Sequence, residues 1–128
     1  MQPVLANYLK ALESKIHLKA AVLFGSTARE EADRWSDLDL CIIAEDLPTD
    51  FRERMDLLWA EKPPAFDVVG FRPSEMVDLI FRPMILDILL EGRVVAGDME
   101  NLRQRAQVHL EQEGLERTAF GYAKRQAA

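Results

Sequence analysis

The stretch AVLFGSTAREEADRWSDLDLCII, residues 21–43, decides the fold. It joins two apolar runs through a polar link, with Gly25 and Ser26 after the first run and Asp37 and Asp39 at the start of the second. A short, continuous apolar run is typical of a strand that is buried on both faces. Side chains two residues apart on a strand point to the same side, so the two aspartates share one face. The stretch therefore predicts two buried strands with polar groups at their adjoining ends.

The aspartates suit a divalent cation. Mg²⁺ prefers oxygen ligands and is commonly held by one or two carboxylates together with the phosphates of a substrate. Asp37 and Asp39 can therefore reach the same ion or an adjacent pair. Asp67 stands alone among apolar residues in the third predicted strand, AFDVVGF, and a lone acid there is costly unless it is paired or metal-bound. It is either a third carboxylate of this site or the partner of a nearby arginine, Arg72 or Arg82.

The Gly-Ser pair suits a phosphate. Glycine after a strand lets the backbone approach a ligand closely, and a helix that starts there points free N–H groups at an anion. Ser26 adds a hydroxyl donor, and Arg29 is either a phosphate contact or a solvated helix residue. A phosphate cradle beside metal-binding carboxylates is what nucleotidyl transfer requires, because charge on the triphosphate and the leaving pyrophosphate must be stabilised.

Each half of the pattern has an ordinary explanation when it is taken alone. Gly25 and Ser26 could be a strand end followed by a helix cap. Asp37 and Asp39 could lie on a solvent-facing strand edge, with Ser36 in a turn. A phosphatase-type D-x-D motif is a further alternative, although there the nucleophilic aspartate ends an apolar strand rather than beginning one. Only the pairing of the two half-motifs favours nucleotidyl transfer.

The remaining sequence predicts an α/β domain, with helices packed on a small sheet. Asp50 is expected to cap a helix whose apolar stripe is Phe51, Met55, Leu58 and Trp59. Ser74 is expected to cap a later helix. The apolar run from Met84 to Leu90 is wider than one helical face, so it is either core or in part a docking surface. The predicted helices are residues 3–16, 51–62, 74–81, 83–91 and a tail over 98–128; the predicted strands are 20–24, 37–44, 65–71 and an edge strand over 93–97.

Composition sets limits on the class of protein. At 128 residues and 48% hydrophobic, the chain is predicted to form one domain, residues 1–128. A formal net charge of −6 repels a nucleic-acid backbone and argues against a nucleic-acid binder. Cys41 lies in an apolar run and is predicted to be a core residue. His17 and His109 have no spacing that suggests zinc. The chain shows neither a signal peptide nor a membrane span, so we expect a cytoplasmic protein with no membrane contact.

The two half-motifs, G-S-x-A-R at residues 25–29 and S-D-x-D-L at residues 36–40, together resemble those of the minimal nucleotidyltransferases of the polymerase-β superfamily. The resemblance covers about residues 3–96, which leaves the tail outside it. It implies a polymerase-β-like nucleotidyltransferase fold with a mixed sheet, ATP as substrate and two Mg²⁺ ions. The residues that it implies are Asp37, Asp39 and Asp67 for catalysis and metal binding, and Gly25, Ser26, Arg29 and Ser36 for the nucleotide.

The resemblance also implies a partner. Many short members of this family are antitoxins of HEPN-type ribonuclease toxins, and they either transfer AMP from ATP to a tyrosine of the toxin or silence it by binding. Our first hypothesis is the transferase, and the second is a binding module that acts by occlusion. Glu30 favours the second, since the family commonly has glycine or another small residue there. A third hypothesis is transfer to a small molecule or to RNA, and the acidic net charge of the chain argues against RNA. Homo-oligomerisation stays open.

Overall fold

A four-stranded mixed sheet lies at the centre of the fold, with strand order β3-β2-β1-β4. The computed structural model describes residues 3–25, 38–119 and 121–125. The predicted short helix after Gly25 therefore lies outside the described residues. β1 is antiparallel to both β2 and β4, whereas β2 and β3 are parallel, which confirms the predicted small mixed sheet. The strands of this sheet are β1 (Leu18–Leu23), β2 (Leu38–Ala44), β3 (Phe66–Phe71) and β4 (Arg93–Gly97).

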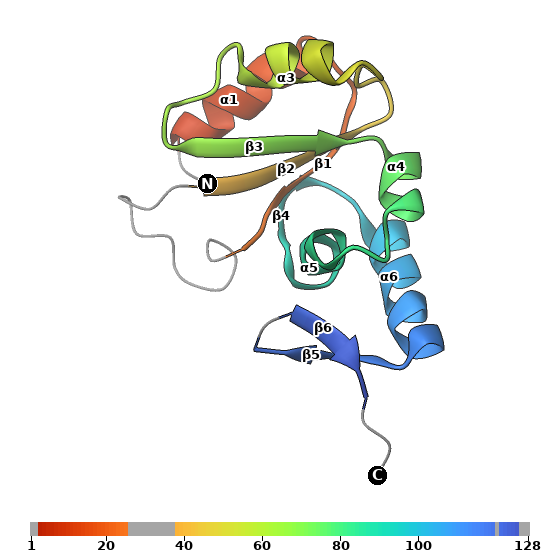
Figure 1. The fold of residues 1–128 in the computed structure, drawn as a ribbon. Coiled ribbons are helices and arrows are strands. Elements are labelled where there is room, and N and C mark those ends of the chain that lie inside the picture. Colours follow the sequence, from red (N-terminus) through yellow and green to blue (C-terminus); the bar gives the residue numbers. More distant parts are fainter. Residues whose placement is uncertain (1–2, 26–37, 120, 126–128) are drawn as a thin grey trace.

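Two helices, α1 (Pro3–Glu13) and α3 (Phe51–Trp59), cover one face of the sheet (Figure 1). The amphipathic first helix is confirmed, because Leu5 and Leu9 on its inner side are buried against the sheet. The hydroxyl of Tyr8 donates a hydrogen bond to the main-chain oxygen of Leu58, which ties α1 to α3. This layer encloses the first of two apolar clusters.

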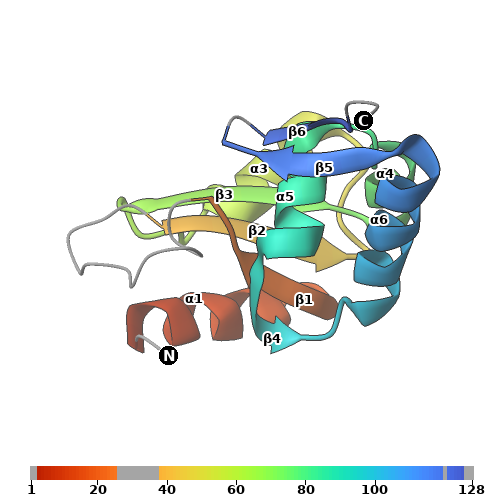
Figure 2. The ribbon, with the colours of Figure 1, turned by 90° about the horizontal axis from the view of Figure 1, so that it is seen from below.

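Three helices cover the opposite face: α4 (Pro73–Asp78), α5 (Pro83–Glu91) and α6 (Glu100–Glu113). Figure 2, seen from below, shows α5 crossing the sheet with α6 beside it. Ile85 and Leu89 are fully buried in the second apolar cluster, whereas the Met84 side chain is 45% exposed. Most of the apolar run is therefore core. None of the helices in the described part of the chain is long and apolar enough to cross a membrane.

The apolar stripe predicted for α3 is only partly correct. Asp50 caps this helix as predicted, and Leu58 is buried. Phe51 and Trp59, however, are 73% and 51% exposed, while the charged Arg54 is buried. The reason is position: β3 is an edge strand, and Figure 2 shows α3 extending past it on the outer side of the sheet.

The predicted helical tail ends at Glu113, and the prediction is wrong beyond that residue. Gly114 adopts a left-handed conformation with φ of 62°, which stops α6 and turns the chain back. An antiparallel hairpin follows, formed by β5 (Leu115–Thr118) and β6 (Gly121–Lys124). It lies against α5 on the side away from the sheet (Figure 1).

Candidate active site

Two of the predicted carboxylates lie side by side at the start of neighbouring strands. Asp39 is the second residue of β2 and Asp67 is the second residue of β3, and the parallel register pairs them. Paired residues of adjacent strands point to the same face, with the strands about 4.8 Å apart. Asp39 is half-buried and Asp67 is exposed. The tertiary fold thus brings together two acids that are 28 positions apart in the sequence.

Alternation along the strands tells which face carries these carboxylates. Asp39 is followed on its own face by Cys41, and Asp67 is followed by Val69. Cys41 is buried in the second apolar cluster and Val69 packs against it. The carboxylates therefore lie on the face that α5 covers, beyond its apolar residues, at the edge of the sheet where β2 and β3 begin.

Gly25 closes the site on the β1 side. Its φ is +66°, a left-handed conformation that side chains other than glycine rarely adopt. A Cβ atom at this position would lie 3.0 Å from Oδ2 of Asp39. The preceding residue, Phe24, donates its N–H to the main-chain oxygen of Asp39 at 3.0 Å. Glycine is thus required both for the backbone turn and for the close approach to the Asp39 carboxylate.

The other predicted site residues fall on 26–37, outside the described residues. These are Ser26, Arg29, Ser36 and Asp37, and their roles stay predictions. The described residues alone contain no group of three acidic, histidine or cysteine side chains that could hold a metal ion.

The alternative explanation for Asp67 was a buried ion pair with an arginine, and neither candidate arginine provides one. Within residues 3–25, 38–119 and 121–125, Asp67 has no ion pair. Arg72 donates its Nε hydrogen to the main-chain oxygen of Glu45 at 2.8 Å, and Arg82 lies over the Phe81 ring. An exposed carboxylate in register with Asp39 is available to a ligand.

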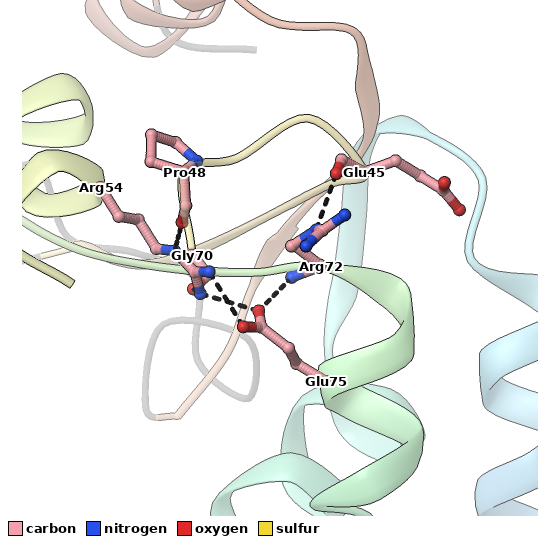
Figure 3. Close-up of polar contacts among 6 residues, drawn as sticks. All are labelled: Glu45, Pro48, Arg54, Gly70, Arg72 and Glu75. Atoms are coloured by element: carbon pink, nitrogen blue, oxygen red, sulfur yellow. Dashed lines mark hydrogen bonds and ion pairs between the residues drawn. The ribbon is translucent and has the colours of Figure 1, made fainter. Parts of the chain in front are cut away.

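Arg54 forms a buried clamp at the other end of β3 (Figure 3). Its guanidinium donates two hydrogen bonds to the carboxylate of Glu75, at 2.7 and 2.9 Å. It also donates to the main-chain oxygens of Gly70, at 3.1 Å, and Pro48, at 2.8 Å. This side chain therefore joins α3, β3, α4 and the loop before α3. Its charge hides this role in the sequence, although Arg54 lies four residues before Leu58 and so shares the inner side of α3.

Glu75 also takes part in the N-terminal cap of α4, where the predicted cap is wrong. The helix begins at Pro73, with Arg72 rather than Ser74 as its N-cap. The N–H of Met76 already donates to the Arg72 oxygen at 3.2 Å, so Ser74 lies inside the first turn, and Oε1 of Glu75 accepts the N–H of Arg72 at 2.7 Å. The hydrogen bonds from the Arg54 side chain, together with the Arg72 N–H, hold the pKa of Glu75 below its ordinary value against the opposing effect of burial.

The cysteine and the histidines take no part in this site. Cys41 is fully buried, and burial raises the pKa of its thiol far above the ordinary value, which confirms a core residue. The ring of His17 is almost fully exposed and contacts Asp46 at 3.0 Å. His109 lies on α6 and lines the cavity between α4 and α6, away from both aspartates.

Comparison with known proteins agrees with this geometry. A family model described as a nucleotidyltransferase domain matches residues 5–96. None of the curated proteins compared matches the chain.

Several solved structures share the fold. A chain of a toxin–antitoxin complex with AMP-PNP is 22% identical, with a TM-score of 0.55, over 83% of this chain and 84% of that one. A chain of the MntA-HepT toxin–antitoxin is 19% identical, with a TM-score of 0.55, over 88% and 86%. A chain of a tri-AMPylated HEPN toxin with its MNT antitoxin, from Shewanella oneidensis, is 21% identical, with a TM-score of 0.53, over 85% and 82%.

The predicted polymerase-β-like fold is thereby confirmed, and the family match covers the Gly25 turn and both aspartate strands. The chain belongs to the nucleotidyltransferase domain family.

Proposed function

We propose that this protein transfers AMP from ATP to a hydroxyl group of a protein acceptor, most simply a tyrosine of a HEPN-type toxin, and so acts as an antitoxin. The observation that carries this proposal is the parallel register of Asp39 with Asp67, together with the glycine turn against the Asp39 carboxylate. Family membership supplies the reaction class, and the geometry supplies residues that suit it.

The donor set fits Mg²⁺. If the two carboxylates keep the spacing of their strands, about 5 Å, they repel each other, and water around the exposed Asp67 screens part of this cost. A divalent cation between them removes this cost, and carboxylate oxygens are the ligands that it prefers. We assign Asp37, Asp39 and Asp67 to bind two Mg²⁺ ions, which would neutralise the triphosphate and the leaving pyrophosphate.

The protein's own groups would carry the rest of the reaction. The acceptor oxygen forms a bond to the α-phosphorus of ATP, while the bond from that phosphorus to pyrophosphate breaks. Asp67, the exposed carboxylate, takes the proton from the acceptor hydroxyl. Gly25 and Ser26 hold the triphosphate through main-chain and hydroxyl donors, and Arg29 and Ser36 add further phosphate contacts.

Similar solved structures support a protein acceptor. One is a toxin–antitoxin complex with AMP-PNP, and another contains a HEPN toxin that is tri-AMPylated beside its MNT antitoxin. The formal charge of −6 on this chain works against an RNA acceptor, because like charges repel. A HEPN-type toxin is therefore the partner that we propose.

The second candidate is a binding module that neutralises its partner by occlusion. It is favoured by Glu30, a carboxylate that directly follows Arg29 in the phosphate-binding motif. A negative charge beside a triphosphate would weaken nucleotide binding.

Transfer of label from ATP labelled at its α-phosphate tests the proposal. The wild-type protein is compared with Asp39→Asn and Asp37→Asn in a lysate of the source cells with magnesium. Asp78→Asn, which alters an exposed aspartate on α4, is the matched control. We expect protease-sensitive label with the wild type and the control only. Nuclease-sensitive label would make RNA the acceptor, and absence of any Asp39-dependent label would leave occlusion as the mechanism.

Calorimetry with Mg-ATP gives a second readout that does not require an acceptor. Asp39→Asn should weaken binding by at least about tenfold, since each lost charge-assisted contact is worth about 1.5–3 kcal/mol. Unchanged affinity would contradict the assignment of Asp39 to the metal.

A further inference from the structure

A groove of about 690 Å³ lies between α3 and the outer edge of β3. The apolar residues that line it come from both elements: Phe51, Met55 and Trp59 from α3, and Val69 and Phe71 from β3. The three α3 residues are spaced four apart, so they form one continuous stripe. Phe51 and Trp59, which the sequence would place in the core, are mostly exposed here. An exposed apolar stripe of this kind is typical of a docking surface.

The outer edge of β3 cannot simply accept another strand, because side chains already occupy its carbonyls. The indole N–H of Trp59 donates to the main-chain oxygen of Val68 at 3.0 Å. Arg54 donates to the main-chain oxygen of Gly70 at 3.1 Å. Strand addition requires free donors and acceptors along the edge. The groove is therefore suited to bind apolar side chains of a partner rather than its backbone.

The candidate catalytic carboxylate, Asp67, lies on β3 two residues before Val69, a residue that lines the groove. Asp67 and Val69 are two residues apart on β3, so their side chains share a face and lie about 6.6 Å apart along the strand. Trp59 contacts Val68, the residue between them, whereas Arg54 contacts Gly70 farther along. α3 thus runs antiparallel to β3, and Trp59 is the groove residue at the Asp67 end.

A second cavity of similar volume, about 690 Å³, lacks this continuity. It is lined by α4, α6 and the turn after α4, including Ile80 and the half-exposed Val108, and no strand of the sheet contributes to it. It therefore offers a control surface of similar volume, although polar side chains such as Asn101 and Gln104 make up most of its lining.

We propose that the groove between α3 and β3 binds an apolar segment of the acceptor protein and presents its tyrosine to Asp67. The Trp59 ring lies where it can pack against the acceptor phenol, an arrangement that aromatic pairs favour when their centroids are about 4.5–7 Å apart. Trp59 is a positioning residue, and Phe51 anchors the segment at the far end. This inference rests on the proposed adenylyl transfer.

Steady-state transfer to the purified acceptor, identified by its label from α-labelled ATP, tests the docking. Phe51→Glu places a charge in the groove, and Val108→Glu places the same charge in the control cavity. We expect Phe51→Glu to raise KM for the acceptor at least about tenfold, with kcat and Mg-ATP affinity unchanged. The lost contacts bind the acceptor equally in the ground state and in the transition state, so their removal weakens binding without slowing the chemical step. Val108→Glu should leave KM within about twofold of the wild-type value.

Two further variants separate the Trp59 ring from its hydrogen bond. Trp59→Phe and Trp59→Leu both lose the indole N–H that binds Val68, but only the first keeps an aromatic face. We expect KM for Trp59→Leu to exceed that for Trp59→Phe by at least about threefold, within the range of about 0.5–1.5 kcal/mol for an aromatic pair. Equal KM values would overturn the positioning role, since both variants lose the bond to Val68 and only one of them keeps an aromatic ring.

The remaining outcomes distinguish the two proposals. If Phe51→Glu keeps the wild-type KM and transfer still depends on Asp39, the docking proposal is overturned, while the proposed adenylyl transfer is unaffected. A raised KM in Val108→Glu alone would move the acceptor to the α4–α6 cavity. A wild-type dimer in sedimentation that Phe51→Glu dissociates would make the groove a contact between two copies of this chain. Absence of wild-type transfer would overturn both proposals.

Discussion

Replacement of Arg54 by methionine tests how the fold holds α3 against β3. Methionine keeps an unbranched apolar stem in the buried position and removes the guanidinium with its four hydrogen bonds. The carboxylate of Glu75 then keeps only the Arg72 N–H, and the Gly70 and Pro48 oxygens lose a donor. The variant therefore isolates the clamp shown in Figure 3 with little change in volume.

The magnitude follows from these contacts. Breaking a buried ion pair by removing one partner costs about 3–5 kcal/mol. The Arg54 side chain is 8% exposed but that of Glu75 is 33% exposed, so water can solvate the remaining carboxylate. We therefore expect the free energy of unfolding to fall by about 3 kcal/mol, near the lower end of that range. For a chain of this size the loss corresponds to a fall in Tm of about 10 °C.

The stability that the Arg54–Glu75 ion pair contributes should depend on pH. The Arg54 hydrogen bonds lower the pKa of Glu75 from its ordinary value of 4.5. The clamp's contribution is therefore fully present above that value, and it is lost as pH falls through the lowered pKa of the folded state. The difference in stability between wild type and Arg54→Met should be largest near neutral pH and should shrink in acid.

Urea unfolding followed by circular dichroism measures these differences. The control is Arg52→Met, which alters an exposed arginine on the same helix and should change stability by less than about 0.5 kcal/mol. A loss below about 1 kcal/mol for Arg54→Met near neutral pH would refute the clamp. A loss that stays constant in acid would show that packing, rather than the ion pair, carries the effect.

Three further substitutions have distinct expected outcomes. Gly25→Ala forces a side chain into a left-handed turn, which should lower the free energy of unfolding by about 1–2 kcal/mol. Its Cβ also displaces the Asp39 carboxylate, so the rate of label transfer should fall even under conditions where the variant is fully folded. Asp67→Asn removes an exposed charge, so urea unfolding should stay within about 0.5 kcal/mol of wild type while transfer is lost; retained transfer would exclude Asp67 from catalysis. Tyr8→Phe removes the hydroxyl donor to the Leu58 oxygen and should cost about 1–2 kcal/mol; an unchanged urea midpoint would show that water replaces this bond.

Local sequence patterns predicted the regular elements well, because each depends on neighbours in the chain. The apolar runs became β1 and β2, Asp50 capped α3, and the helix predicted over 83–91 became α5. The errors fell where a distant group decided the outcome. Ser74 is an exception with a local cause, since the helix already begins at Pro73 and Glu75 binds the N–H of its N-cap, Arg72. The predicted helical tail gave way to a hairpin, which is anchored by Arg117 on Asp87 at 3.2 Å.

The sequence by itself determined which residue types are available for nucleotidyl transfer, because strand alternation predicts one shared side for Asp37 and Asp39 and glycine permits the turn at residue 25. Only the tertiary structure decided that Asp67 lies beside Asp39, since register between strands depends on how β2 and β3 pair. It also decided that Arg54 is buried while Phe51 and Trp59 are exposed. A sheet covers only part of the apolar surface of a helix that lies over its edge strand, so the rest of that surface stays exposed. Periodicity alone does not tell which strand lies at the edge.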